Sequence, residues 1–290
     1  MSPIRILAVV VGLVIVAAQP VAAGSPDPSP STVRYYLSLG DSLAVGYQPI
    51  GPEAADHRTD EGYPDQLVVL ARDAIPGLEL VKLGCPGEST SSMTQPNPRC
   101  PQPSGSQLDA ALAFIGAHPG QVAFITIDIG FADFPRDDIS SLGPGIEAIE
   151  QNLPQILYAL AQAAPGTPLV GMTIYDPFLP AWLTGDQGFA ELSVPIVQSI
   201  NRALTGVYTA MGTSIADVEG AFDTTDFTTL VPLEGVGDVP LNVARVCTWT
   251  WLCAAPPLGP DRHPNEQGHA AIAAAFWQQL APLLAALPGA

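Results

Sequence analysis

The chain is poor in positive charge, and Lys82 is the single lysine among its 290 residues. Lysine and arginine together number 10 against 28 aspartates and glutamates, which gives a formal net charge of −18. Proteins that bind nucleic acid or anionic membranes use lysine and arginine to neutralise phosphate groups. The composition therefore argues against both kinds of partner, and we attribute the acidity to solubility outside the cell.

The N-terminal apolar run is too short for a membrane span. Arg5 precedes the apolar residues 6–18, and residues 21–23 (Val-Ala-Ala) form a small-residue cleavage site. A membrane-crossing helix needs roughly 20 apolar residues, so we favour a removed signal peptide, residues 1–23, over an uncleaved anchor. No cysteine stands at the cleavage point, which argues against a bacterial-type lipid anchor. The sequence therefore predicts a secreted protein.

The segment that follows, residues 24–31, is rich in proline and serine and has no apolar pattern that could pack. Such a composition is typical of a flexible leader. We predict that residues 32–290 form a single domain. We also expect a monomer with no stable membrane insertion.

Cysteine is scarce, and its four positions fall in two local pairs. In an exported chain this spacing predicts the disulfides Cys85–Cys100 and Cys247–Cys253. Zinc binding is the alternative, but the pairs lie far apart and lack the C-x-x-C spacing of a structural zinc site. We therefore expect no metal site.

Apolar strands alternate with helical segments along the chain. The predicted strands are residues 35–39, 78–83, 122–129, 169–174 and 214–218, and the predicted helices are residues 63–75, 106–117, 146–164, 189–211 and 265–287. Strands that are apolar on both faces indicate an α/β fold with helices on both sides of a parallel sheet. Right-handed crossovers place the carboxyl ends of all strands at one edge. The long insertion at residues 217–258 is expected to cover a site at that edge.

Residues that could act chemically follow two of the predicted strands and precede the last predicted helix. Ser42 follows the first strand and Gly40, at the edge where open α/β sheets bind ligands. Gly84 follows the second strand, and its N–H could donate to a developing oxyanion, a contribution of about 3 kcal/mol. A serine becomes nucleophilic beside a base that is itself oriented by an acceptor, and His263 and Asp261 stand together before the last helix.

Four segments, in this order, resemble the blocks of the GDSL or SGNH hydrolase family. They are residues 40–43 (Gly-Asp-Ser-Leu), Gly84, residues 129–133 (Ile-Gly-Phe-Ala-Asp) and residues 261–264 (Asp-Arg-His-Pro). The stretch from Cys247 to Cys253 is similar to the secreted esterase branch.

The resemblance implies a three-layer α/β/α, flavodoxin-like fold and ester hydrolysis without a metal or other cofactor. It implies that Ser42 is the nucleophile and His263 the base. It also implies that the backbone N–H groups of Ser42 and Gly84 are oxyanion donors.

One departure from the family pattern is Ala132, which stands where the third block normally has an asparagine. The amide of that asparagine is the third oxyanion donor, and losing one such donor costs roughly a hundred- to a thousandfold in rate. Two backbone donors remain, so we expect weakened catalysis. We expect Asp133, at the end of the block, to have a structural role.

A second departure concerns the acidic partner of the histidine. The common last block is D-x-x-H, whereas Asp261 is two residues before His263. We assign Asp261 as the group that orients the imidazole. The alternative is a Ser–His dyad in which a backbone carbonyl holds the ring.

Other polar and aromatic residues have weaker signals. We predict His269 to be a packing or surface residue, His57 and His118 to be surface groups, and Asp176 to form an Asp-Pro turn rather than line the cleft. Five aromatic residues could form an apolar platform for an acyl group or a sugar: Tyr175, Phe178, Trp182, Trp249 and Trp251. For Trp249 and Trp251, which lie near the cysteines, loop packing is an equally good explanation.

These features predict a secreted serine esterase or lipase that forms an acyl-serine intermediate. Its substrates would be small-molecule, lipid or acylated-glycan esters, and the fold does not choose among them. The alternative is a catalytically impaired relative that binds lipid or glycan in the same cleft. A third hypothesis is a phospholipid acyltransferase, which forms the same acyl-enzyme intermediate.

Overall fold

The structure is a computed structural model that describes residues 33–49, 57–134 and 139–286. The predicted signal peptide (1–23) and leader (24–31) lie outside these residues. The described residues belong to one compact unit that starts at Val33. None of the helices in the described part of the chain is long and apolar enough to cross a membrane.

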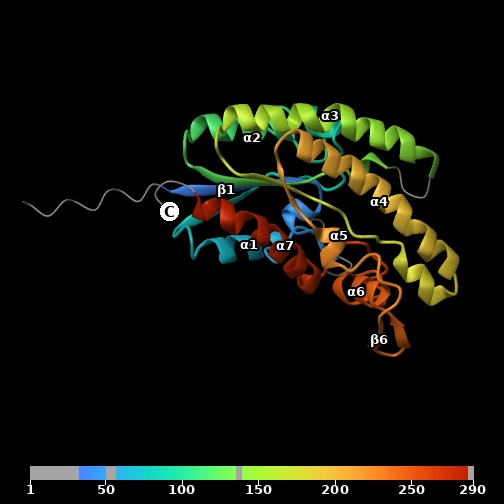
Figure 1. Cartoon of the computed structure of the whole chain (residues 1–290). Helices are drawn as coiled ribbons and strands as arrows, with labels where there is room; N and C mark the ends of the chain where they lie inside the picture. The colour runs from blue at the N-terminus through green and yellow to red at the C-terminus, as the bar shows by residue number, and fades with distance from the viewer. Residues whose placement is uncertain (1–32, 50–56, 135–138, 287–290) are drawn as a thin grey trace, which may run out of the picture. The chain divides into compact units, whose positions relative to one another are not determined.

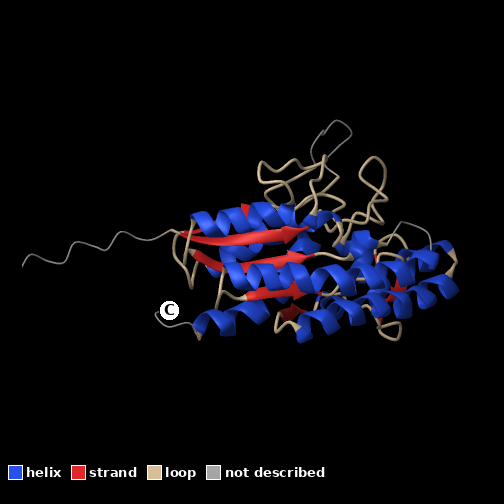
Figure 2. Ribbon diagram, turned by 90° about the horizontal axis from the view of Figure 1, so that it is seen from above, coloured by secondary structure: helices blue, strands red, loops and turns tan. Residues whose placement is uncertain are grey.

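A five-stranded parallel sheet forms the middle layer, in the order β2-β1-β3-β4-β5 (Figure 2). The strands are β1 (Arg34–Gly40), β2 (Leu78–Lys82), β3 (Val122–Asp128), β4 (Leu169–Met172) and β5 (Ser214–Ala216). Each predicted strand is present, with ends that differ by two residues or fewer. The central β3 is buried along its whole length, which explains its unbroken apolar sequence.

Helices cover both faces of the sheet, so the architecture is the expected three-layer α/β/α fold. Figure 1 shows α2, α3 and α4 on one face and α1 and α7 on the other. The helices are α1 (Tyr63–Ala71), α2 (Gln107–Ala117), α3 (Leu142–Ala163), α4 (Gln187–Ala210), α5 (Val218–Ala221), α6 (Leu241–Trp249) and α7 (Glu266–Ala285). Short 3₁₀ helices are η1 (Leu43–Val45), η2 (Ser92–Thr94), η3 (Phe131–Asp133), η4 (Ile139–Ser141) and η5 (Leu179–Thr184).

Three of these helices contain an internal proline: α3, α4 and, near its end, α7 (Pro282). Pro154 lies inside α3 and Pro195 inside α4, and α3 starts at Leu142, four residues before the predicted start. An internal proline removes one helical hydrogen bond. The helices α3 and α4 persist because a long apolar face of each is buried, which outweighs the lost bond.

The insertion at residues 217–258 differs from its expected role as a cover. It contains α5, α6 and a hairpin of β6 (Leu230–Leu233) and β7 (Gly237–Pro240). None of its residues lines the two pockets described below beside Ser42. Instead the Trp251 N–H donates to the His263 carbonyl (3.0 Å), and the Asp261 N–H donates to the Trp251 carbonyl (3.1 Å). The insertion therefore supports the loop that carries His263.

Candidate active site

Ser42 lies on a tight turn that is fixed against the neighbouring strand. Gly40 ends β1 with φ +129°, and a Cβ at this position would lie 1.9 Å from the Asp128 carbonyl oxygen, so only glycine fits. The Asp41 N–H donates to that same carbonyl (3.0 Å). The side chain of Gln107 binds both the N–H and the carbonyl of Gly40, at 2.7 and 2.9 Å. Ser42 is thus held at the carboxyl edge of the sheet, as predicted.

The structure brings Ser42, His263 and Asp261 together in a hydrogen-bonded row. Nε2 of His263 lies 2.9 Å from Oγ of Ser42, and Nδ1 lies 2.7 Å from Oδ1 of Asp261. The same Asp261 oxygen accepts the His263 backbone N–H at 2.9 Å. This is the geometry in which an imidazole can take a proton from a serine while a carboxylate orients the ring. The acceptor at Nδ1 is therefore the Asp261 carboxylate, not a backbone carbonyl.

The surroundings of Asp261 keep it ionised. Burial alone raises the pKa of this carboxyl, but the hydrogen bonds from the ring and backbone of His263, with the nearby positive charges, bring the net pKa below its usual value. A carboxylate beside the imidazole stabilises the imidazolium that forms when the ring accepts a proton. Tyr47, which the sequence pattern did not single out, packs its ring 4.2 Å from that of His263.

Gly84 packs directly against the serine turn. A Cβ at Gly84 would lie 2.5 Å from Cβ of Ala44 and 2.8 Å from the Asp41 carbonyl oxygen, so a larger residue would push the turn away. The Cys85 N–H donates to the Gly40 carbonyl (3.0 Å), which extends the contact between the ends of β1 and β2. The segment that follows β2 thereby brings its backbone next to Ser42.

Ala132 and Asp133 lie in η3, just after β3. Ala132 lines the same pocket as Ser42 and His263, and its methyl group offers no hydrogen-bond donor there. Asp133 accepts hydrogen bonds from the backbone N–H and the hydroxyl of Thr90, at 2.9 and 2.7 Å. Asp133 therefore has the structural role expected of it, because it ties η3 to the loop after β2.

A second buried carboxyl, Asp128, lies behind the serine turn. Oδ1 of Asp128 accepts a hydrogen bond from the Tyr63 hydroxyl (2.7 Å). The neighbouring carboxyl of Asp41 accepts hydrogen bonds from the Leu43 N–H (3.0 Å) and from the Ser42 hydroxyl (3.3 Å). Burial, and then the charge of Asp41, raise the pKa of Asp128 well above its usual range. Burial and the neighbouring Asp41 therefore favour the protonated form of Asp128. Its one sequence signal is an acidic residue at the end of an apolar strand.

Two pockets meet at Ser42 and His263. The first, here called the apolar pocket, is a cavity of about 50 Å³ whose other walls are mainly apolar. Its apolar lining is Leu43, Ile129, Phe131, Met172, Ile174, Tyr175 and Pro177. The second, here called the arginine pocket, is a cavity of about 240 Å³ that includes Tyr47, Pro86, Gly87, Arg99, Ala132, Phe134 and Arg262.

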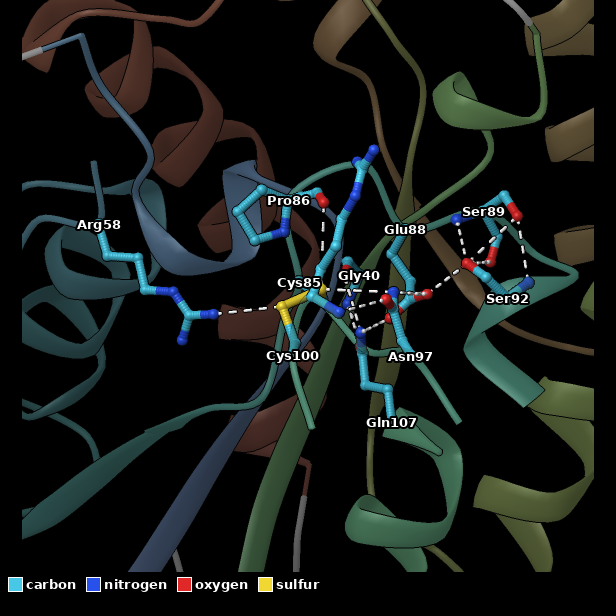
Figure 3. The surroundings of a disulfide bond; sticks show 11 residues. Gly40, Arg58, Cys85, Pro86, Glu88, Ser89, Ser92, Asn97, Cys100 and Gln107 are labelled. Carbon is cyan, nitrogen blue, oxygen red and sulfur yellow. Dashed lines mark hydrogen bonds between the residues drawn. A yellow bond between two sulfur atoms is a disulfide. The ribbon is translucent and has the colours of Figure 1, made fainter. Parts of the chain in front are cut away.

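The two predicted disulfides are present, and one of them borders the site. Cys85 is bonded to Cys100, and Cys247 to Cys253. Figure 3 shows Cys85 and Cys100 beside Glu88, a buried residue that accepts hydrogen bonds from Asn97 (3.0 Å) and Gln107 (3.0 Å). Because Cys85 directly follows Gly84, this disulfide anchors the loop after β2 next to the serine turn.

The remaining histidines lie away from the reacting groups. His269 is fully buried, and its Nδ1 accepts the Tyr63 backbone N–H at 3.1 Å. Burial lowers the pKa of His269 to about 3, so the ring is neutral and packs α7 onto α1. His57 and His118, which we predicted to be surface groups, are partly exposed and partly covered by neighbouring rings. His57 lies against the Tyr47 ring (5.0 Å), and His118 lies against Phe114 (4.2 Å).

Asp176 forms a turn, as predicted, and does not line either pocket. It is fully buried and accepts hydrogen bonds from the Phe178 N–H (2.8 Å) and the Ser193 hydroxyl (2.6 Å). The five aromatic residues do not form one platform. Of the five, Tyr175 lines the apolar pocket, whereas Trp182 packs near Phe227 and Trp249 packs against Phe222.

Among the described residues, no group of three or more histidine, cysteine, aspartate or glutamate side chains is arranged to hold a metal ion. The groups that line the pockets at Ser42 include the His263 imidazole, the Asp41 carboxyl and the guanidinium groups of Arg99 and Arg262. Such a set suits proton transfer and nucleophilic attack on a carbonyl.

Comparisons with solved structures place the fold among ester hydrolases. An acetylxylan esterase from Geobacillus stearothermophilus matches with a TM-score of 0.51 at 17% identity, over 85% of this chain and 94% of that one. A carbohydrate acetylesterase from Sinorhizobium meliloti matches with a TM-score of 0.50 at 12% identity, over 86% and 99%. A protein from Parabacteroides merdae described as a GDSL-like lipase matches with a TM-score of 0.53 at 15% identity, over 86% and 95%.

At such low identity these structures show the shared fold alone. No curated protein sequence matches the chain. The model of the GDSL-like lipase/acylhydrolase family, however, matches residues 38–271, a range that contains Ser42, Gly84, Ala132 and His263. The chain therefore belongs to the GDSL-like lipase/acylhydrolase family and is an ester hydrolase.

Proposed function

We propose that the protein is a secreted serine esterase that removes small acyl groups through an acyl-serine intermediate. The observation that carries the proposal is the row Ser42–His263–Asp261, with distances of 2.9 and 2.7 Å between the reacting atoms. These distances lie within the range in which a base can abstract a serine proton.

In the first half of the reaction, Oγ of Ser42 attacks the ester carbonyl carbon while Nε2 of His263 accepts the hydroxyl proton. The carbonyl π electrons move to the oxygen, and the N–H groups of Ser42 and Gly84 stabilise the resulting oxyanion. When the tetrahedral intermediate collapses, the bond to the alcohol oxygen breaks and His263 returns the proton to that oxygen. Asp261 stabilises the imidazolium between these two transfers.

In the second half, water replaces the alcohol. His263 takes a proton from the water as it attacks the acyl-serine carbonyl, and then gives that proton to Oγ of Ser42 as the acid leaves. The original serine proton thus leaves on the alcohol and a proton from water replaces it, so Ser42 and His263 end in their starting states and no redox step is involved.

The small size of the apolar pocket supports a short acyl group. It holds about 50 Å³ and is walled by Met172, Ile174 and Tyr175, all of them buried. The acetylesterases with the same fold act on acetyl esters, which agrees with this size. We therefore propose acetyl or similarly short esters as the substrate class, in place of long-chain lipids.

Fluorophosphonate labelling, followed by hydrolysis of p-nitrophenyl esters of increasing chain length, tests the proposal. We expect stoichiometric labelling of Ser42 in the wild type, none in Ser42→Ala, and a kcat/KM that falls as the chain lengthens. Ser38→Ala is a matched control, because Ser38 is a buried serine of β1 outside both pockets. Folded protein that is not labelled at Ser42 would overturn the enzyme proposal.

One observation favours a second candidate, a relative that binds esters or glycans with little turnover. Ala132 lines the pocket beside Ser42, and its methyl group cannot donate a hydrogen bond to an oxyanion. This candidate predicts that Ser42 is labelled slowly and that acetylated glycans bind without release of acetate. Measurement of acetate release from the bound glycan separates the two.

Secretion is supported by the two disulfides, which form in oxidising compartments. N-terminal sequencing of protein collected from culture medium tests it. We expect the mature chain to begin at Gly24.

A further inference from the structure

The arginine pocket concentrates positive charge in an otherwise acidic protein. The whole sequence has 10 lysines and arginines against 28 acidic residues, yet Arg99 and Arg262 both line this one pocket beside Ser42. The proposed mechanism uses neither guanidinium. Arg99 is therefore a candidate to bind a ligand of opposite charge.

The backbone of Arg99 is held firmly in place. Its N–H donates to Oδ1 of Asn97 (3.0 Å), and Asn97 in turn donates to the buried carboxylate of Glu88 (3.0 Å). The next residue, Cys100, is bonded to Cys85, which follows Gly84. Figure 3 shows Cys85, Glu88, Asn97 and Cys100 close together. Arg99 is thus fixed to the strand end that also carries the oxyanion donor.

The guanidinium of Arg99 is available to a ligand. It occupies the space left open by Gly87, because a Cβ on Gly87 would lie 2.9 Å from its Nη1. Across the residues that the structure describes, this guanidinium has no hydrogen-bond or ion-pair partner. The nearby Glu88 carboxylate is bound by Ser92, Asn97 and Gln107 instead.

Arg262 brings the second positive charge. It directly precedes His263, and its guanidinium carbon lies 5.5 Å from the centre of the Phe131 ring, which lines both pockets. Its backbone carbonyl accepts the Tyr175 hydroxyl (2.5 Å), which fixes the residue between the two pockets.

We propose that the alcohol part of the substrate carries an anionic group, a carboxylate or a phosphate, that binds Arg99 in the arginine pocket. The inference rests on the proposed ester hydrolysis. With the acyl group in the apolar pocket, the alcohol part leaves Ser42 on the side of the arginine pocket. A guanidinium binds carboxylate and phosphate oxygens with two parallel N–H donors. The positive charge of Arg262 also attracts the anionic group, and the proposal requires no direct contact between them.

Three acetate esters that differ in one group test this proposal. They are para-acetoxybenzoate, para-acetoxyphenyl phosphate and the neutral para-acetoxybenzamide. The measured quantity is the ratio of kcat/KM for each anionic ester to kcat/KM for the neutral one. This ratio is independent of the fraction of folded enzyme, and the comparison of the carboxylate and phosphate ratios identifies the preferred anion.

In Arg99→Ala we expect both ratios to fall about tenfold relative to wild type, because a charge-assisted pair is lost. Arg99→Lys should restore part of the loss, since it keeps the charge but not the paired donors. Added salt should lower the wild-type ratios. The matched control is Arg202→Ala, which removes an exposed arginine on α4 outside the pocket and should leave the ratios unchanged.

Two results would overturn the proposal. Equal ratios in Arg99→Ala and wild type would show that Arg99 does not bind the anion. An equal loss on all three esters would show that Arg99 acts on the oxyanion or on the loop. Failure of the proposed function looks different, because wild-type enzyme would then hydrolyse none of the three esters and Ser42 would not be labelled.

Discussion

At the scale of single residues, the proposed mechanism predicts that Ala132 limits the rate. Ala132 lies in η3 and lines the arginine pocket with Ser42, and its methyl group cannot donate a hydrogen bond to the oxyanion. We expect Ala132→Asn to raise kcat on p-nitrophenyl acetate at least several-fold, because one added donor contributes about 3 kcal/mol when fully aligned. An unchanged or lower kcat would mean that another group completes the oxyanion hole.

The orienting role of Asp261 is tested by Asp261→Asn. The asparagine keeps the size of the side chain but loses the charge that stabilises the imidazolium. We expect kcat to fall roughly a thousandfold with little change in KM. A fall of less than about tenfold would favour a Ser–His dyad in which the carboxylate is dispensable. Circular dichroism of the variant checks that the fold is intact.

Asp128 gives a pH-dependent effect on stability. Its pKa is raised by burial and by Asp41, so the folded protein holds a proton that the unfolded chain releases above its own pKa of about 4. The wild-type free energy of unfolding therefore falls as pH rises from about 4 toward the raised pKa. Asparagine needs no proton, so we expect Asp128→Asn to gain stability relative to wild type as pH rises. Urea unfolding across this pH range measures it, and a difference independent of pH would contradict the assignment.

At the scale of elements, the contact between the end of β2 and the serine turn sets the geometry of the site. Gly84→Ala would place a methyl group 2.5 Å from Cβ of Ala44 and so displace the turn. We expect kcat to fall at least about tenfold and Tm to drop, because a small shift of the nucleophile is costly. The control is Gly116→Ala in α2, where no atom lies within 4 Å of the new Cβ and the change should be neutral or stabilising.

The strands and most helices were predictable because their signals are local. β3 is an unbroken apolar run, and α2 begins at Ser106, whose hydroxyl accepts the Asp109 N–H as a helix cap. α6 and the β6–β7 hairpin escaped prediction, because proline and threonine break the apolar pattern around them. Those elements are stabilised by tertiary contacts, which a short window of sequence does not contain.

The residues that the proposed mechanism uses could be picked out from the sequence for a related reason. Ser42, Gly84 and His263 each stand beside a glycine, a strand end or a proline that precedes a helix, and these signals are local. Tyr47 and Asp128 were missed as site residues. Tyr47 packs against His263, and Asp128 is hydrogen-bonded to Tyr63. In each case the partner is distant in the chain, so a short window of sequence does not reveal the contact.

At the scale of the whole molecule, the disulfides differ in how much they constrain the chain. Cys85–Cys100 closes a loop with a sequence separation of 15, and Cys247–Cys253 one of 6. Chain entropy gives stabilisations of about 3 and about 2 kcal/mol. We expect the free energy of unfolding to fall more in the double variant Cys85→Ser, Cys100→Ser than in Cys247→Ser, Cys253→Ser. Guanidinium unfolding of both measures this, and the reverse order would contradict the loop-entropy account.

The distance along the chain between the two reacting side chains has a consequence for biosynthesis. Ser42 and His263 are separated by 221 positions, and the loop that holds His263 rests on α6 and leads into α7. A ribosome makes Ser42 early and His263 late, so a growing polypeptide carries a serine hydroxyl with no base beside it. With Ser42 and His263 in their proposed roles, ester cleavage can begin only after translation has passed residue 263 and the late segments have packed. The proposed mechanism thus predicts that the cell that makes this hydrolase is spared the activity of its unfinished copies.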